Sequence, residues 1–348
     1  MKSVYASSVV VAALSAGFGS VHAEGFNFYA LLDGGIASTS ISKGGASKTE
    51  FVTGGYAPNF FGLTSEKSLG SGLTGGFKLE QGFLLTGKDV FGDNAAFGPD
   101  GLFNRQANLY VKGGFGTVTV GTQGNIAFSS VLLGEPRAGS NFGSALASID
   151  LDGKLGTVDQ GAVSYASPVS GGFSVAATFV PEKDATKSGQ RLAGTYAGKD
   201  FAVSLAGYND DAGHGITNKG TVLSGNYKLG AVTFKGLSVT QKTSVFSSLG
   251  TVGAGGAYAL NADTTLDFGV FKTTDSKAHY DVSTWAAGIQ YKFLKDLTVY
   301  GQYASVKNND TQTAAFNFAG PSSANLTSSI AKGQTASTLN VGLLYGFF

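Results

Sequence analysis

Asn340-Val341-Gly342-Leu343-Leu344-Tyr345-Gly346-Phe347-Phe348 ends the chain, and its alternation decides the fold. One face of this stretch carries Val341, Leu343, Tyr345 and Phe347. The other face carries Asn340, Gly342, Leu344 and Gly346. A two-residue repeat with one lipid face and one lumen face is typical of a membrane-spanning β-strand. Such strands must close into a barrel, because an open sheet edge would leave backbone hydrogen bonds unmade in hydrocarbon.

The same alternation recurs along the rest of the chain. Residues 26–40 place Phe26, Phe28, Ala30, Leu32, Gly34 and Ile36 on one face. Residues 284–293 set Trp285, Ala287, Ile289, Tyr291 and Phe293 against Thr284, Gln290 and Lys292. The period is 2 and not the 3.6 of a helix. Because each strand needs about 10 residues plus a connection, the chain predicts an all-β fold, an antiparallel transmembrane barrel of about 16 strands.

The first 23 residues have the organisation of a cleavable export signal. Lys2 supplies a positive charge, residues 9–19 form a short apolar run, and Val21-His22-Ala23 resembles a small-residue cleavage site. The apolar run is shorter than the about 20 residues that a membrane-crossing helix needs. We therefore expect a signal peptide over residues 1–23 and one barrel domain over residues 24–348. The alternative for the run is a short buried strand or helix.

The composition differs from that of an ordinary soluble protein. Charged residues make up 14% of the chain, against about 25% in globular proteins. The chain holds 53 glycines, and nearly all its aromatic residues are Phe or Tyr, as barrel strands and interfacial girdles require. The girdle candidates are Tyr165, Phe173, Tyr196, Phe201, Tyr227 and Tyr291. Cysteine is absent, and a net charge of +1 gives no basic surplus for nucleic-acid binding.

Connections between the predicted strands alternate between short and long, which is typical of the two ends of an outer-membrane barrel. The short ones are residues 68–71, 113–114, 168–171, 198–200, 229–230, 261–262 and 294–296. The long polar ones include residues 43–49, 87–101, 211–219 and 307–334. Residues 124–156 form a long connection with many apolar residues, so we expect this one to pack inward.

Several stretches resemble the Gram-negative general porins, in the branch typical of betaproteobacteria. Residues 25–33 (GFNFYALLD) resemble the opening strand of that family, and residues 77–83 (FKLEQGF) its third strand. Residues 102–107 (LFNRQA) followed by 115–121 (FGTVTVG) give the nearest match. The resemblance implies a 16-stranded homotrimer in the outer membrane that lets small hydrophilic solutes and ions diffuse passively.

The resemblance also implies a constriction, formed where the third outer loop folds into the lumen. Its basic wall position falls on Arg105, and Lys78 and Glu80 have the same lumen-facing parity. The acidic residue of the loop falls on Glu135. One wall arginine usual in the family is replaced by Phe60. Another falls near Val158, where Lys154 is a candidate to replace the charge.

Charged residues on the long connection complete the set of constriction candidates. Besides Glu135, this segment carries Arg137, Asp150, Asp152 and Lys154. Each of them either faces the constriction, where unlike charges select ions, or tethers the loop to the wall. Asp150-Leu151-Asp152-Gly153 lacks the other ligands of a calcium loop, so no metal is expected.

Enzymatic chemistry finds no support in the sequence. The three histidines, His22, His214 and His279, form no zinc cluster and no Ser-His-Asp arrangement. No G-x-S-x-G motif is present, and we expect neither a cofactor nor catalysis. The sequence thus predicts a general diffusion channel. It leaves open a substrate-specific channel, or a surface adhesin barrel that conducts nothing.

Overall fold

The computed structural model describes residues 25–45, 47–85, 101–149, 155–182, 188–213, 216–243, 248–275, 279–310 and 330–348. The predicted signal, residues 1–23, lies outside these ranges. The first half of the chain forms β1 (Asn27–Ile41), β2 (Ser47–Thr53), β3 (Phe60–Gly70), β4 (Leu73–Gly82), β5 (Gln106–Gly113), β6 (Gly116–Gly124), α1 (Ile126–Gly134), α2 (Leu146–Ile149), β7 (Val158–Ala166) and β8 (Phe173–Val180). The second half forms β9 (Gly189–Ala197), β10 (Phe201–Gly213), β11 (Ile216–Leu229), β12 (Val232–Thr243), β13 (Ser248–Ala259), β14 (Thr264–Asp275), β15 (Tyr280–Lys292), β16 (Leu297–Asn308) and β17 (Thr335–Phe347).

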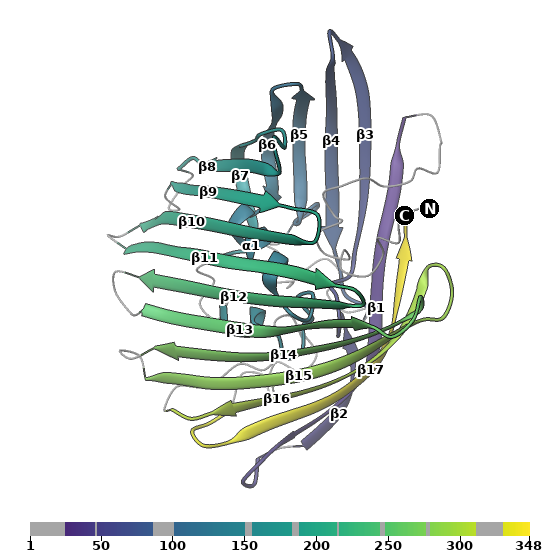
Figure 1. Cartoon of the computed structure of the whole chain (residues 1–348), viewed down its shortest axis with the longest axis vertical. Coiled ribbons are helices and arrows are strands. Elements are labelled where there is room, and N and C mark those ends of the chain that lie inside the picture. The colour runs from purple at the N-terminus through teal and green to yellow at the C-terminus, as the bar shows by residue number, and fades with distance from the viewer. Residues whose placement is uncertain are drawn as a thin grey trace.

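The strands form one closed antiparallel barrel. From β3 to β17 each strand pairs with the next in chain order, and β17 pairs with β1 (Figure 1). Both β2 and β3 pair with β1, β2 over residues 34–40 and β3 over residues 27–31. These two segments therefore share one position in the wall, and the predicted 16-stranded antiparallel barrel is confirmed.

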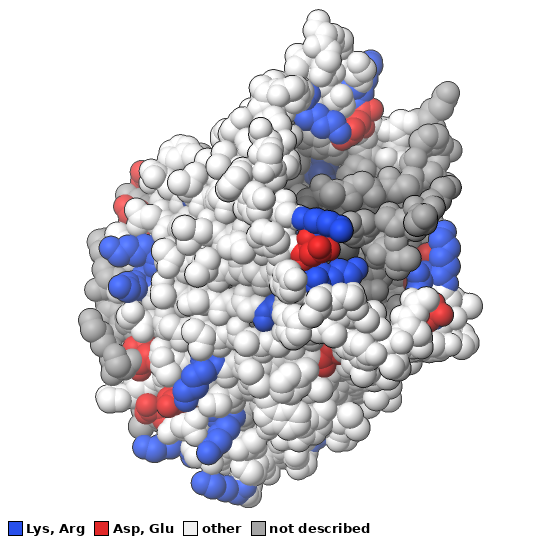
Figure 2. All heavy atoms as spheres, viewed as in Figure 1, with Lys and Arg blue, Asp and Glu red and all other residues white. Residues whose placement is uncertain are grey.

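The predicted alternation gives the wall two different faces. In β17, Val341 is 51% exposed whereas its neighbour Asn340 is fully buried. Exposed apolar side chains repeat in this way on the other strands, and we call this side of the wall the belt face. The alternate residues form the polar face. Figure 2 shows a visible surface that is mostly uncharged, with the Lys, Arg, Asp and Glu side chains in a few separate groups.

Aromatic side chains mark the belt face beside the short turns. Phe173, Phe201, Tyr227 and Tyr291 are exposed there, as the girdle prediction requires. Tyr196 lies between two of them, with ring centroids 4.4 Å from Phe173 and 5.5 Å from Phe201. The two α-helices among the described residues are too short, at nine and four residues, to cross a membrane.

The predicted short connections coincide with turns between paired strands, for example at Gly198–Asp200 between β9 and β10. One long loop was predicted wrongly. Residues 211–219 are not a loop, because β10 continues to Gly213 and β11 begins at Ile216. The polar side chains of this stretch belong to long strand ends that stay paired, with Asn209 opposite Lys219.

The connection between β6 and β7 carries both helices. Asn125 caps α1, because its side-chain oxygen accepts the N–H groups of Ala127 and Phe128 at 2.8 and 3.2 Å. The same side chain donates to the Leu155 carbonyl at 2.7 Å, which joins the two ends of the connection. α1 is mostly apolar, and its buried residues Ala127, Ser130, Val131 and Gly134 need a surface to pack against. It packs against β9 to β12 in a buried cluster with Val222, Leu237 and Val239.

Candidate pore-lining site

The predicted wall residues Lys78, Glu80 and Arg105 lie together with Tyr29, which was not predicted, and we call these four residues the Arg105 cluster. Lys78 and Glu80 are two residues apart on β4 and therefore share the polar face. Arg105 immediately precedes β5, and its Nε donates to Glu80 Oε1 at 2.6 Å. Lys78 Nζ lies 3.6 Å from Glu80 Oε2, and the Tyr29 hydroxyl donates to that oxygen at 2.7 Å.

Two cations thus share one carboxylate in this cluster. The Glu80 side chain is 1% exposed, whereas those of Lys78 and Arg105 keep 14% and 11% exposure. Glu80 is buried beneath its partners, and the groups left accessible are cationic. The cluster carries a local surplus of one positive charge.

Phe60 supports the guanidinium of Arg105. Its ring is almost fully buried on the polar face, and the Arg105 guanidinium carbon lies 4.6 Å from its centroid. Lys78 Nζ lies 5.6 Å from the ring centroid of Tyr29 in the same way. Cations placed over aromatic faces are attracted by the ring quadrupole. The aromatic rings therefore fix where the two positive charges stand.

Glu135 of the connection is fully buried and does not face open solvent. Its carboxylate accepts the backbone N–H groups of Arg137 and Gly139 at 2.7 and 2.6 Å. The N–H of Ala145 lies 3.4 Å from its other oxygen. Burial raises the pKa of Glu135, while the Gly139 N–H and the nearby Lys235 ammonium oppose that rise. The Glu135 side chain therefore stabilises a turn within the connection, because it binds backbone N–H groups that follow it in sequence.

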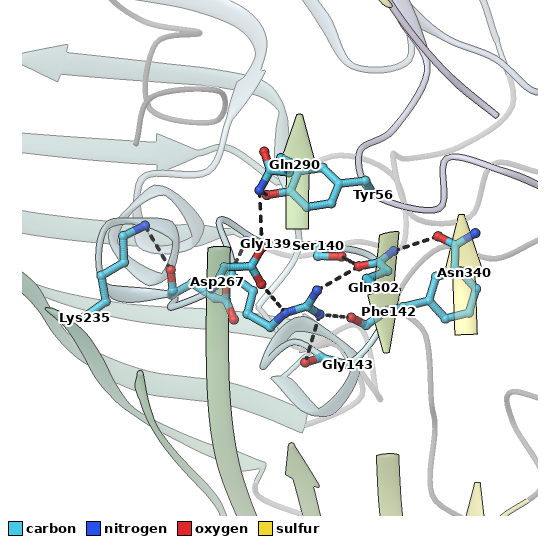
Figure 3. Close-up of polar contacts among 12 residues, drawn as sticks. Tyr56, Gly139, Ser140, Phe142, Gly143, Lys235, Asp267, Gln290, Gln302 and Asn340 are labelled. Atoms are coloured by element: carbon cyan, nitrogen blue, oxygen red, sulfur yellow. Dashed lines mark hydrogen bonds and ion pairs between the residues drawn. The ribbon is translucent and has the colours of Figure 1, made fainter. Parts of the chain in front are cut away.

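Arg137 is also fully buried, and it joins the connection to the wall. Its partners Asp267, Gln302 and Phe142 lie around one point in Figure 3. Its Nε donates to Asp267 Oδ1 on β14 at 2.7 Å, and its Nη2 donates to Gln302 Oε1 on β16 at 2.8 Å. Its Nη1 donates to the carbonyl of Phe142. All three nitrogens of the guanidinium are used. Arg137 is therefore a tether of the connection and not an exposed charge.

A second segment meets the connection at this point. Residues 54–59, between β2 and β3, leave the ladder of the wall and contact the connection. Asn141 Nδ2 donates to the Gly54 carbonyl at 2.5 Å, and the Asn141 N–H donates to the Tyr56 carbonyl at 3.2 Å. Gln302, which holds Arg137, also donates to the Gly55 carbonyl at 2.8 Å. The sequence reasoning missed this segment, although Gly54, Gly55 and Pro58 signal an interruption in a strand.

Asp33 of β1 holds residues 54–59 in place. One of its carboxylate oxygens accepts the N–H groups of Tyr56 and Ala57, both at 2.6 Å. The other oxygen accepts the Tyr300 hydroxyl at 2.7 Å. Asn59 bonds both to the Asp33 N–H and to its carbonyl. This buried carboxylate replaces the backbone partners that the strand interruption removes.

The sequence analysis also missed a charged cluster formed by Arg191, Asp159 and Asp210. Arg191 of β9 lies between Asp159 of β7 and Asp210 of β10 on the polar face. Its Nε is 2.8 Å from Asp159 Oδ1, and its Nη2 donates to Asp210 Oδ2 at 3.2 Å. One cation here faces two carboxylates, which is the reverse of the Arg105 cluster. Asp150, Asp152 and Lys154, the other predicted constriction residues, lie outside the described residues.

These features define a class of protein: a closed 16-stranded barrel with an apolar exterior and charged groups on its other face. A sequence profile of the Gram-negative porins matches residues 6–311. The chain therefore belongs to the Gram-negative porin family, whose members are outer-membrane channels for passive diffusion. A comparison with curated protein sequences found no match.

Solved porin structures share the fold at low sequence identity. An anion-selective porin from Comamonas acidovorans has a TM-score of 0.80 and 17% identity, covering 92% of this chain and 99% of the other. OmpT of Vibrio cholerae in its trimer form scores 0.64 at 16% identity, covering 92% and 99%. OmpF of Salmonella typhi, in complex with daunomycin, scores 0.65 at 14% identity, covering 92% and 97%.

Proposed function

We propose that this porin is a general, non-specific channel, through which small hydrophilic solutes and ions pass down their own gradients. The observation that carries the proposal is the two-faced wall. Its belt face suits lipid, and its polar face offers charged and amide groups to water. Passage through such a pore needs neither a cofactor nor an energy source, and the mechanism is diffusion sieved by width and charge.

The lumen is narrowed, in our proposal, by residues 125–149 together with residues 54–59. Supporting this, both segments bond to side chains of the polar face. Asp33 lies on β1, Asp267 on β14 and Gln302 on β16. α1 reaches further round, with Ser130 Oγ 2.9 Å from Ser204 Oγ on β10. A segment fixed to opposite parts of one wall must lie across the space that the wall encloses.

The charges at the narrowed part set a weak preference for anions. The Arg105 cluster leaves one positive charge in excess, and its exposed groups are cationic. Glu135 and Arg137 are buried, so they affect passing ions only through their electrostatic field and not by direct contact. The Comamonas porin of the same fold is anion-selective. Asp159 and Asp210 around Arg191 oppose a strong preference.

Recording single channels of the purified protein in a planar bilayer tests this function. We expect large ohmic current steps that no particular sugar blocks, and a reversal potential in a salt gradient that lies slightly on the anion side. Saturable block by one class of solute would instead indicate a substrate-specific channel. Absence of current steps would indicate a closed barrel with another role, such as a surface adhesin.

We also propose a homotrimer, exported by means of a signal peptide over residues 1–23. An aromatic cluster on the belt face of β1, β3, β4 and β17 is a suitable contact between protomers, because aromatic residues are enriched in such interfaces. Phe28, Phe61, Phe83 and Phe347 form a chain of contacts at 5.8 to 6.3 Å between ring centroids, and Phe26 and Phe77 form a separate pair at 6.0 Å. N-terminal sequencing of the mature protein tests the signal, and we expect Glu24 as its first residue.

A further inference from the structure

A row of polar side chains, each paired with the next, crosses four neighbouring strands of the belt face. Gln190 on β9 pairs with Asn209 on β10, which pairs with Lys219 on β11. Lys219 in turn lies directly opposite Lys242 on β12. All four side chains are exposed. Figure 2 shows basic side chains at the left margin of the molecule, over the ends of these strands.

Lys219 and Lys242 are an unfavourable pair as they stand. Like charges directly opposite each other on neighbouring strands repel. Among the described residues the structure records no ion pair for either ammonium group. The lysine Lys272 on β14, by contrast, is paired with Asp281. An anion between Lys219 and Lys242 would relieve their repulsion.

A hollow in the belt face lies directly beside the two lysines. It has a volume of about 1280 Å³ and is bordered by both Lys219 and Lys242. Phe179, Leu192 and Leu205 give it apolar sides. Thr221 and Thr240 also line it, and their hydroxyl groups bond to each other at 2.7 Å, which reduces the polarity that they present to lipid. The hollow therefore suits hydrocarbon, whereas its rim suits an anion.

The position of Lys219 and Lys242 along the barrel axis agrees with an anionic headgroup at the rim and an acyl chain in the hollow. Lys219 lies eight residues from the girdle residue Tyr227 on the same face of β11. At about 3.3 Å per residue and a tilt of about 40°, these residues span roughly 20 Å along the barrel axis. The apolar band of such barrels is about 25 Å tall, so the ammonium groups stand near its far border, at the level of lipid headgroups.

We propose that this hollow is a binding site for a phosphate-bearing membrane lipid. Its phosphate lies between Lys219 and Lys242, and its acyl chain fills the hollow along Leu192 and Leu205. The basic rim and the apolar floor complement the two parts of such a molecule, and basic pockets on membrane proteins bind lipid headgroups by this attraction. The site lies on the outside of the barrel and is independent of conduction.

Native mass spectrometry of the detergent-solubilised full-length protein, titrated with dioleoyl phosphatidic acid, tests this proposal. We expect one tightly retained lipid per chain in the wild type. In the Lys219→Gln/Lys242→Gln variant we expect about 30-fold weaker binding, since each lysine near an anionic headgroup contributes about a factor of five. The matched control Lys292→Gln/Lys295→Gln removes two exposed lysines at the opposite end of the barrel and should bind as the wild type does.

A second variant tests the acyl part of the site while keeping both lysines. A Cβ at Gly207, which lines the hollow, would meet only the Gly220 carbonyl, at 3.8 Å. The backbone at Gly207 therefore accepts a side chain, and in Gly207→Leu, whose side chain takes up space in the hollow, we expect weaker lipid binding with unchanged single-channel conductance. Dioleoylglycerol, which lacks phosphate, and inorganic phosphate, which lacks a chain, should neither bind tightly nor displace the lipid.

Three results would overturn the proposal. Equal lipid binding by the wild type and Lys219→Gln/Lys242→Gln would remove the lysines from any site. Full displacement by inorganic phosphate would mean a simple anion site. A change of oligomeric state in the variant, with lipid binding intact, would mean that the hollow is a contact between copies of the chain. None of these results would alter the channel activity, so they leave the proposed function unaffected.

Discussion

Single residues decide how much charge this barrel offers to a passing ion. Glu80 accepts from Arg105, Lys78 and Tyr29 and is almost fully covered by them. Arg137 and Asp267 neutralise each other in a fully buried ion pair. The predicted constriction charges Lys78, Glu80 and Arg105 are therefore paired with one another, and Arg137 is paired with a carboxylate that the sequence did not point to. The exposed remainder at the Arg105 cluster is a single positive charge.

The first prediction concerns that remainder. Arg105→Ala lowers the local surplus from one positive charge to none, so the reversal potential in a salt gradient should move toward cations. Glu80→Gln should move it in the opposite direction, because it leaves two cations without their carboxylate. Lys292→Ala, at the turn end of β15, is the control and should change nothing. An unmoved potential in Arg105→Ala would remove this residue from the filter.

The second prediction concerns the tether Arg137. Arg137→Met leaves Asp267 as a buried charge without its partner, and such losses cost about 3 to 5 kcal/mol. The thermal unfolding midpoint in detergent should fall accordingly. Arg137→Met/Asp267→Asn removes both charges and should recover part of the loss. A single variant as stable as the wild type would mean that the ion pair does not hold the connection.

The third prediction concerns the acidity of Glu135. Burial raises its pKa above the ordinary 4.5, so the folded state favours the protonated form. The stability from this shift is complete below about pH 4.5 and is lost as the pH rises through the raised pKa. Glu135→Gln does not titrate, and its unfolding midpoint relative to the wild type should therefore rise between acid and neutral pH. A difference that stays constant across this range would contradict the raised pKa.

At the scale of elements, two segments that do not belong to the wall depend on each other. Residues 125–149 carry α1 and the tether, and residues 54–59 bond to them through Asn141 and Gln302. Gly143 lies at the contact with the wall. A Cβ there would stand 2.4 and 2.8 Å from the Cβ atoms of Ala304 and Ala286. Only a residue without a side chain fits this approach.

The fourth prediction uses that contact. Gly143→Ala should displace the connection from β15 and β16, lower the unfolding midpoint by an amount typical of overpacking, about 1 to 3 kcal/mol, and change the single-channel conductance. Gly161→Ala is the matched control, since Gly161 has a similar positive φ of 58° against 66° but nothing within 4 Å of its Cβ. Equal effects of both substitutions would mean that backbone strain alone, and not the contact, is responsible.

Strands and turns were predictable from the sequence where the pattern that specifies them involves only residues close together in the chain. The alternation in residues 340–348 and the turn residues at 198–200 depend only on neighbours in the chain, and both predictions are confirmed. Lys78 and Glu80 share a face for the same reason. The partners of Arg137 were not predictable, because Asp267 and Gln302 reach it only through the stagger of strands far along the chain. Arg191 meets Asp159 and Asp210 for the same reason.

At the scale of the whole molecule, closure of β17 on β1 gives a barrel with no free edge. Such a sheet has all its ladder bonds paired within itself and resists detergent at room temperature. The fifth prediction follows from closure and from the proposed trimer. An unheated sample should migrate on a denaturing gel as a folded trimer, and a boiled sample near the mass of one chain, at most 35.4 kDa. Identical migration of both samples would contradict a stable trimer.

The interruption at residues 54–59 has a consequence for how the barrel is assembled. A plain strand can slide past its neighbour by two residues and keep the same face toward lipid. Here such a slide would pull Tyr56 and Ala57 away from the Asp33 carboxylate, and Asn59 away from the Asp33 backbone. The interruption between β2 and β3 thus allows only one register of these two strands against β1. This register is set before β17 pairs with β1 and closes the barrel.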